Sequence, residues 1–294
     1  MKRKMKVRFG IILALLSAFL YAFNFIIEKK YITETDSFSI LFLMYLGAGI
    51  GLFIIHLISK KRKKKKKDLK NRLTKKEVPF VLLIVICELA ASFLTIEAVK
   101  IVDASLVSLL SVFEIIATAF FAFLITKKPM AKNELLSTIL MIIGFIILNF
   151  KSGILSNVGL GSLLVIGGCI FWGIENNITA LISAKEPAFF TSIKCTSVAL
   201  FYLVFALLSN GIDLYHPILL ILGFFTYGLG ILFYTLSTKY LNANKTTIIF
   251  SFMPMFGVIL AVFIYKELLT PTFMISFVFM LYAILCINVG IEEE

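Results

Sequence analysis

Long apolar runs, interrupted by short polar segments, occupy nearly the whole chain. Ten of these runs have about the 20 residues that an α-helix needs to cross the hydrocarbon core of a bilayer. We therefore predict an all-α membrane protein with ten transmembrane helices, at residues 9–27, 38–58, 78–97, 104–125, 133–150, 159–182, 188–209, 216–238, 243–264 and 271–290.

Composition supports a lipid environment. Hydrophobic residues make up 60% of the chain and charged residues 16%, against about half and about a quarter in a soluble domain. The net charge of +12 could suggest a nucleic-acid partner, but 12 of the 29 Lys and Arg residues lie between Lys60 and Lys76, and five lie in the first eight residues. Both groups flank membrane-length runs, so we expect cytoplasmic loops and no nucleic-acid binding.

The distribution of basic residues predicts the orientation of the chain. With the N-terminus inside, the cytoplasmic segments hold 23 Lys and Arg residues and the outer segments five. Cytoplasmic loops of membrane proteins retain such an excess of positive charge. We therefore expect a multi-pass protein of the cytoplasmic membrane with both termini in the cytoplasm.

Weak internal similarity divides the chain into two halves. Tyr21–Asn24 parallels Trp172–Glu175 at an offset of 151 residues, and Ser111–Glu114 parallels Ser251–Pro254 at an offset of 140. Five spans is an odd number, so the second half enters the membrane in the opposite orientation. Inverted repeats of this kind enclose a binding site near the midplane of the bilayer. The predicted units are residues 1–150, with a polybasic cytoplasmic loop at 59–77, and residues 151–294.

Four charged side chains lie well inside predicted spans, away from their ends, where an unpaired charge costs several kcal/mol and marks a functional candidate. Glu88 and Glu114 lie near mid-depth, and we expect Glu114 to face a central cavity with Glu88 nearby as a second acid. Glu175 and Lys194 lie on consecutive helices, each roughly 10 Å below the same surface. This agreement in depth predicts an ion pair, with a structural clamp and a moving gate as alternative roles.

Further polar and aromatic residues within the spans are candidates for the same site. Asn176 and Asn177 can add hydrogen bonds beside the ion pair, and Asn24 can bond between helices. Pro254 is expected to kink the ninth span. The candidates for an apolar pocket lining are Tyr21, Trp172, Tyr227 and Tyr234.

The absence of known chemical motifs favours transport over catalysis. The sequence has no P-loop or catalytic triad, and its four cysteines lie in apolar runs without a C-x-x-C pair, so we expect no enzyme activity, metal or cofactor. An intramembrane enzyme and a sensor or structural membrane protein are the rival hypotheses. Three acids against one base favour amines, zwitterionic amino acids or cationic drugs over polyanions. The expected partners are lipid and a small-molecule substrate, while the oligomeric state is left open.

Three motifs carry a resemblance to the EamA branch of the drug/metabolite transporter superfamily. They are Tyr21-Ala22-Phe23-Asn24-Phe25, the stretch Glu97–Ser105, and Tyr265-Lys266-Glu267-Leu268-Leu269-Thr270. Some members of that family resemble the chain further, with an acidic-Asn-Asn motif in span six, a Lys in span seven and a Leu-Glu pair in span four. Glu175-Asn176-Asn177, Lys194 and Phe113-Glu114 stand at these positions. The resemblance implies ten helices and transport, often export, of amino acids or other small metabolites.

Overall fold

The computed structural model of the chain describes residues 2–31, 35–62, 73–101, 110–111, 113–127, 130–148, 159–209, 211–265 and 271–292. Within these ranges the chain forms helices and connecting turns and no strand. The elements are α1 (Lys2–Tyr31), α2 (Ser37–Arg62), α3 (Val78–Ile101), α5 (Phe113–Thr126), α6 (Lys132–Leu148), α7 (Leu160–Ile182), α8 (Pro187–Leu208), α9 (Ile218–Gly223), the π-helical turn η3 (Phe224–Gly228), α10 (Leu229–Tyr240), α11 (Ala243–Phe250), α12 (Met253–Tyr265) and α13 (Pro271–Glu292).

Helix occupies part or all of each of the ten predicted spans. Among the described residues, six helical stretches are long and apolar enough to cross a membrane, and shorter apolar stretches occur in α5 and α13. Many of their large apolar side chains are exposed at the surface of the bundle, as lipid requires. The chain is therefore a multi-pass membrane protein, while the number of ten crossings stays a prediction.

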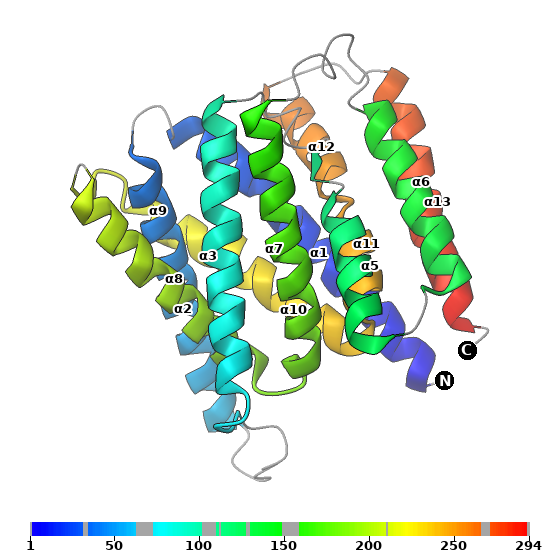
Figure 1. Cartoon of the computed structure of the whole chain (residues 1–294), viewed down its shortest axis with the longest axis horizontal. Helices are drawn as coiled ribbons and strands as arrows, with labels where there is room; N and C mark the ends of the chain where they lie inside the picture. Colours follow the sequence, from blue (N-terminus) through cyan, green and yellow to red (C-terminus); the bar gives the residue numbers. More distant parts are fainter. Residues whose placement is uncertain are drawn as a thin grey trace.

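The helices pack mainly as pairs of elements that are distant in the sequence. Contacts are most extensive between α2 and α8, α3 and α7, α6 and α13, and α1 and α10. Figure 1 shows α3 and α7 side by side at the front of the bundle, with α6 and α13 forming a pair at one edge. Each pair takes one helix from residues 1–150 and one from residues 151–294. The centre of the bundle therefore lies between the two predicted halves.

Close helix contacts depend on glycine at two positions. A Cβ atom on Gly47 of α2 would lie 1.9 Å from the carbonyl oxygen of Leu220 in α9. A Cβ atom on Gly173 of α7 would lie 2.6 Å from the Cβ of Ala117 in α5. Small residues let helix backbones approach in this way. Gly173 thereby sets the distance between two helices that carry predicted site residues.

The helix of the ninth span is interrupted near Pro254. α11 ends at Phe250, a turn follows at Ser251–Phe252, and α12 begins at Met253. Proline has no N–H group, and its ring clashes with the carbonyl of the residue four positions earlier, which here is Phe250. The predicted kink is thus a break just before the proline, and Pro254 itself lies in the first turn of α12.

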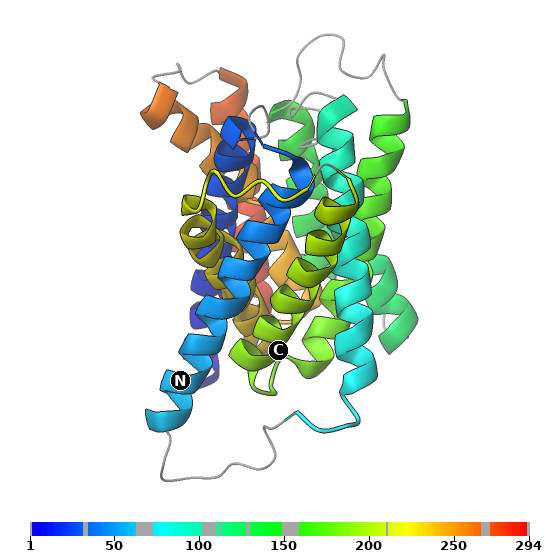
Figure 2. The ribbon, with the colours of Figure 1, turned by 90° about the vertical axis from the view of Figure 1, so that its left-hand side faces the viewer.

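Both chain ends lie at the same end of the bundle. Figure 1 places the start of α1 and the end of α13 at the lower edge, and the last turn of α2 and the first turn of α3 also point that way. Figure 2, turned by 90°, shows the same lower position for the N-terminal and C-terminal labels.

Candidate functional site

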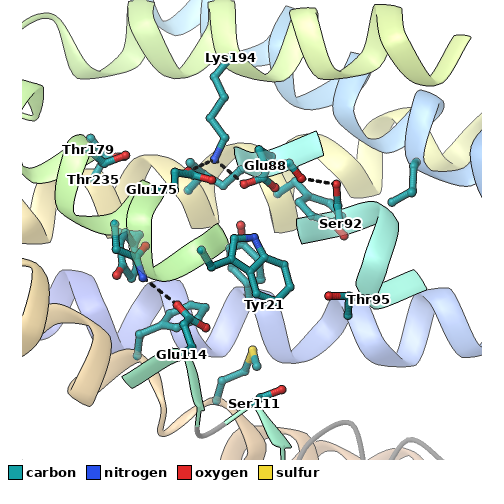
Figure 3. Close-up of a pocket in the computed structure, with 18 of the residues that line it drawn as sticks. Tyr21, Glu88, Ser92, Thr95, Ser111, Glu114, Glu175, Thr179, Lys194 and Thr235 are labelled. Carbon is teal, nitrogen blue, oxygen red and sulfur yellow. Dashed lines mark hydrogen bonds and ion pairs between the residues drawn. The ribbon is translucent and has the colours of Figure 1, made fainter. Parts of the chain in front are cut away.

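A cavity of about 130 Å³ lies in the centre of the bundle. Its walls come from both predicted halves of the chain, and they combine charged, hydroxyl and aromatic side chains (Figure 3). Nine of the eleven charged, asparagine and aromatic candidates line it: Tyr21, Glu88, Glu114, Trp172, Glu175, Asn176, Lys194, Tyr227 and Tyr234.

Lys194 of α8 lies between two carboxylates. Its Nζ is 2.5 Å from Oε1 of Glu175 in α7 and 2.8 Å from Oε2 of Glu88 in α3. The predicted contact between Glu175 and Lys194 is therefore present. Glu88 joins the same cluster, although the sequence suggested only that it lies near Glu114. All three side chains are more than nine-tenths buried.

The surroundings of the two carboxylates differ. The hydroxyl of Tyr45 in α2 donates a hydrogen bond to Oε1 of Glu88, so both oxygens of Glu88 have partners. Oε2 of Glu175 is buried and accepts no hydrogen bond from any donor among the described residues. Its carboxyl group lies within hydrogen-bond distance of that of Glu88, so the two acids can share one proton while no cation is bound. The cluster thus holds two acids around one base, and Oε2 of Glu175 accepts no hydrogen bond from a lysine, hydroxyl or amide among the described residues.

Glu114 forms a second polar centre of the cavity. It lies in the first turn of α5, and its Oε1 accepts a hydrogen bond of 2.9 Å from the side-chain amide of Asn176 in α7. The same amide nitrogen lies 3.1 Å from the hydroxyl of Thr118. Among the described residues, no lysine or arginine forms an ion pair with Glu114. Figure 3 shows Glu114 at the other side of the group of labelled residues from Lys194.

Two predicted candidates do not contribute to the described lining. The amide of Asn177 donates to the backbone carbonyls of Thr118 and Gly173, each at 2.9 Å. This residue holds α7 against α5 and does not line the cavity. The side chain of Asn24 lies outside the described residues, so its role stays a prediction.

Aromatic rings form much of the wall between the two polar centres. The ring of Tyr21 lies 5.7 Å from Tyr227 and 5.2 Å from Phe250, in edge-to-face contacts. The ring of Tyr234 lies 5.3 Å from the same phenylalanine, and its hydroxyl is 2.6 Å from Oγ1 of Thr247. These contacts fix the rings around the cavity.

Sequence reasoning missed several hydroxyl side chains at the site. Ser92 and Thr179 line the cavity, and Thr118 contacts Asn176. Each lies four residues after a predicted acid, namely Glu88, Glu175 and Glu114 in that order. Positions four apart share one helix face, so this spacing was a signal in the sequence. Tyr45 had no comparable signal.

A helical membrane protein that encloses buried charges in a central cavity has the architecture of a membrane transporter. The sequence profile of the EamA-like transporter family matches residues 8–150 and 159–289, and the chain belongs to this family. A protein of Methanothermobacter thermautotrophicus described as an uncharacterized transporter is 24% identical over 240 residues, which cover 76% of this chain and 69% of the relative. A solved crystal structure of another protein superposes with a TM-score of 0.76 over 98% of both chains at 10% identity. That likeness concerns the fold alone.

Proposed function

We propose that the protein is a secondary transporter that exports small metabolites such as amines or amino acids in exchange for protons. Membership of a transporter family supports the class. The observation that carries the proposal is the central cavity, whose walls come from both halves and hold Glu88, Glu114, Glu175 and Lys194. Charges are costly at membrane depth, and a binding site for a charged solute explains why several of them meet there.

Alternating access requires a structure that can close on either side of the cavity, and two inverted five-helix repeats provide one. The packing supports this arrangement of ten transmembrane helices. In the proposed repeat, α7 is the counterpart of α1, α10 of α3, and α11 with α12 of α5. The pair α3–α7 therefore corresponds to the pair α10–α1, and both pairs have extensive contacts. In the same way, the pair α5–α7 corresponds to the contacts of α1 with α11 and α12.

The turns that precede α5 and α12 support the same repeat. A turn at Ser111 precedes the start of α5 at Phe113, and a turn at Ser251–Phe252 precedes the start of α12 at Met253. The two starts are 140 residues apart, the offset that the sequence similarity indicates. Discontinuous helices at corresponding positions commonly border the substrate site of such carriers.

The charges in the cavity support the proposed proton exchange. Three carboxyl groups and one ammonium group leave a negative excess when all are ionised. With no substrate present, protons on the carboxyl groups remove that excess, and a cationic substrate can then displace them.

The experiment is transport by the purified protein in liposomes under an imposed pH gradient. A panel of labelled amines and amino acids should include solutes that accumulate only when protein and gradient are both present. Glu114→Gln keeps the shape of the side chain and should abolish pH-dependent flux while leaving folding intact. Glu97→Gln, which alters an exposed ion pair with Lys100, is the matched control and should transport normally.

A protein that moves no member of the panel would be a sensor or structural membrane protein, and the proposal would be wrong. Normal, still pH-dependent flux through Glu114→Gln would remove this residue from the mechanism.

A further inference from the structure

We propose that the ligand of the cavity carries two cationic groups, and that it is a short linear diamine. This inference rests on the transport function proposed above and names its substrate class. Four features of the described residues carry it: the charge balance of the cavity, an oxygen of Glu175 without a hydrogen-bond donor among them, an acid, Glu114, without a cation among them, and the apolar part of the lining.

The charge balance of the cavity calls for two positive charges. Glu88, Glu114 and Glu175 line it, and Lys194 is the one basic residue in its described lining. With all four groups ionised, the lining carries a net charge of −2. A dication neutralises it completely, whereas a monoamine leaves one negative charge that only a proton can neutralise.

One end of the cavity offers a place for an ammonium group at Glu175. Lys194 binds Oε1 of Glu175 and Oε2 of Glu88, and Tyr45 binds the remaining oxygen of Glu88. Among the described residues, Oε2 of Glu175 accepts no hydrogen bond from a lysine, hydroxyl or amide, although Glu175 is only 6% exposed. A buried carboxylate oxygen without a donor is costly. An ammonium group of the ligand has three N–H donors, and one of them can donate a hydrogen bond to this oxygen.

The other end offers a second place at Glu114. Its Oε1 accepts one hydrogen bond from a neutral amide, that of Asn176. A carboxylate has about four acceptor positions, so Glu114 retains acceptor capacity for a ligand. Figure 3 shows this residue apart from Lys194, and a second ammonium group can bind there without contacting the lysine.

The wall between these ends suits a methylene chain. Tyr21, Trp172, Phe250 and Met253 contribute rings and a thioether to the lining. Aromatic faces also attract ammonium groups, and flexible apolar side chains adapt to hydrocarbon. A zwitterionic amino acid would instead bring a carboxylate to a cavity whose lysine is already held between two acids.

The test compares three four-carbon ligands with the wild-type protein in liposomes: 1,4-diaminobutane, butylamine and 4-aminobutanoate. They share one ammonium group and differ in the group at the far end. Each ligand competes with a labelled solute of the panel that the protein transports. The diamine should inhibit that transport at concentrations roughly ten- to a hundredfold lower than either of the others, because it gains a second charge-assisted contact. Diamines of three, five and six carbons then define the preferred spacing.

The variants locate the two contacts. Because Glu114→Gln is expected to lose its pH-dependent flux, the variants are compared by ligand binding to the purified protein in detergent. Glu114→Gln should reduce the advantage of 1,4-diaminobutane over butylamine in binding to within a few-fold, and Glu175→Gln should do the same. Glu97→Gln should leave the preference unchanged. Size-exclusion chromatography and thermal unfolding in detergent show which variants fold. If Glu175→Gln does not fold, the comparison of the three ligands on the wild-type protein still tests the diamine proposal.

Equal competition by butylamine, or stronger competition by 4-aminobutanoate, would overturn the diamine proposal while the transport function stands. The same holds if the protein transports other amines or amino acids and the diamine has no effect. Absence of transport for every solute tested would overturn the transport function itself.

Discussion

At the scale of single residues, the buried charges are held by one another. Lys194 contacts both Glu88 and Glu175, and the hydroxyl of Tyr45 contacts Glu88. The lysine lowers the cost of burying both acids, and removing it leaves two uncompensated carboxylates. The cluster therefore stabilises the packing of α3, α7 and α8 only while Lys194 is present.

Removal of the central cation should reveal this dependence. Lys194→Ala leaves two adjacent buried carboxylates and should lower the free energy of unfolding by about 3–5 kcal/mol. Adding Glu175→Gln to it should recover part of the loss, because one of the two charges is then gone. Lys100→Ala breaks an exposed pair with Glu97 and should cost about 1 kcal/mol or less. Thermal unfolding in detergent measures all three, and equal effects of the two lysine variants would contradict the role of the cluster.

The sequence predicted part of this site. Glu175 and Lys194 lie on consecutive helices, so their depths alone indicated the pair. Glu88 lies on α3, and nothing local shows that α3 packs against α7 and α8. Asn176 and Asn177 are adjacent, and a helix turns about 100° per residue. Only the packing of α5 determines that the first faces the cavity and the second the helix contact.

At the scale of elements, close helix contacts and helix breaks shape the cavity. Apolar periodicity predicted where the helices lie, and Pro254 predicted the break between α11 and α12. The turn before α5 was indicated only by the weak similarity of Ser111–Glu114 to Ser251–Pro254. The π-helical turn η3 packs closely against α2, since a Cβ on its Gly228 would lie 3.2 Å from the Cα of Ala48, and apolar periodicity did not predict it.

The contact of α5 with α7 should be sensitive to a single methyl group. Gly173→Ala places a Cβ 2.6 Å from the Cβ of Ala117 and 2.8 Å from backbone atoms of α5. The helices must separate, which should cost about 1–3 kcal/mol and weaken substrate binding. Gly159→Ala is the control, because nothing lies within 4 Å of the added atom. Unfolding in detergent measures both, and an unaffected Gly173→Ala would mean that the helices are not in close contact.

A polar link ties the turn before α3 to the turn between α7 and α8. Nζ of Lys185 is 2.6 Å from Oε1 of Glu77, and the backbone N–H of Thr74 donates to Oε2 at 2.7 Å. The bonds from Lys185 and then Thr74 lower the pKa of the Glu77 carboxyl from 4.5 to about 2. The link joins residues of the two halves at one end of the bundle.

The lowered pKa predicts how this link responds to acid. A carboxyl whose pKa falls on folding stabilises the folded state above its unfolded pKa, here 4.5, and loses that contribution as the pH falls towards about 2. The difference in melting temperature between the wild type and Glu77→Gln should therefore be constant from pH 7 to about 5 and shrink below it. Glu97→Gln serves as the control, since its ion pair is more exposed. A difference that does not change with acid would contradict the link.

At the scale of the whole molecule, the two halves are interleaved and do not form separate domains. The main helix pairs each join one half to the other. The sequence indicated two halves through their similarity, but similarity between segments says nothing about which of them touch. The interleaving places the cavity between the halves, so any movement of one half against the other changes access to Lys194 and the acids around it.

The proposed topology makes a prediction that labelling from one side of the membrane can test. Ten crossings with both termini inside place Lys76 in the cytoplasm and Tyr215 outside, and both are exposed, with Tyr215 at 87%. In a variant with the four native cysteines replaced, Tyr215→Cys should react with a membrane-impermeant thiol reagent in intact cells, and Lys76→Cys should react only after permeabilisation. A permeant reagent applied to both variants controls for intrinsic reactivity. Labelling of Lys76→Cys from outside intact cells would reverse the orientation, and labelling of both from outside would require an even number of crossings between them, against the five that the proposed topology places there.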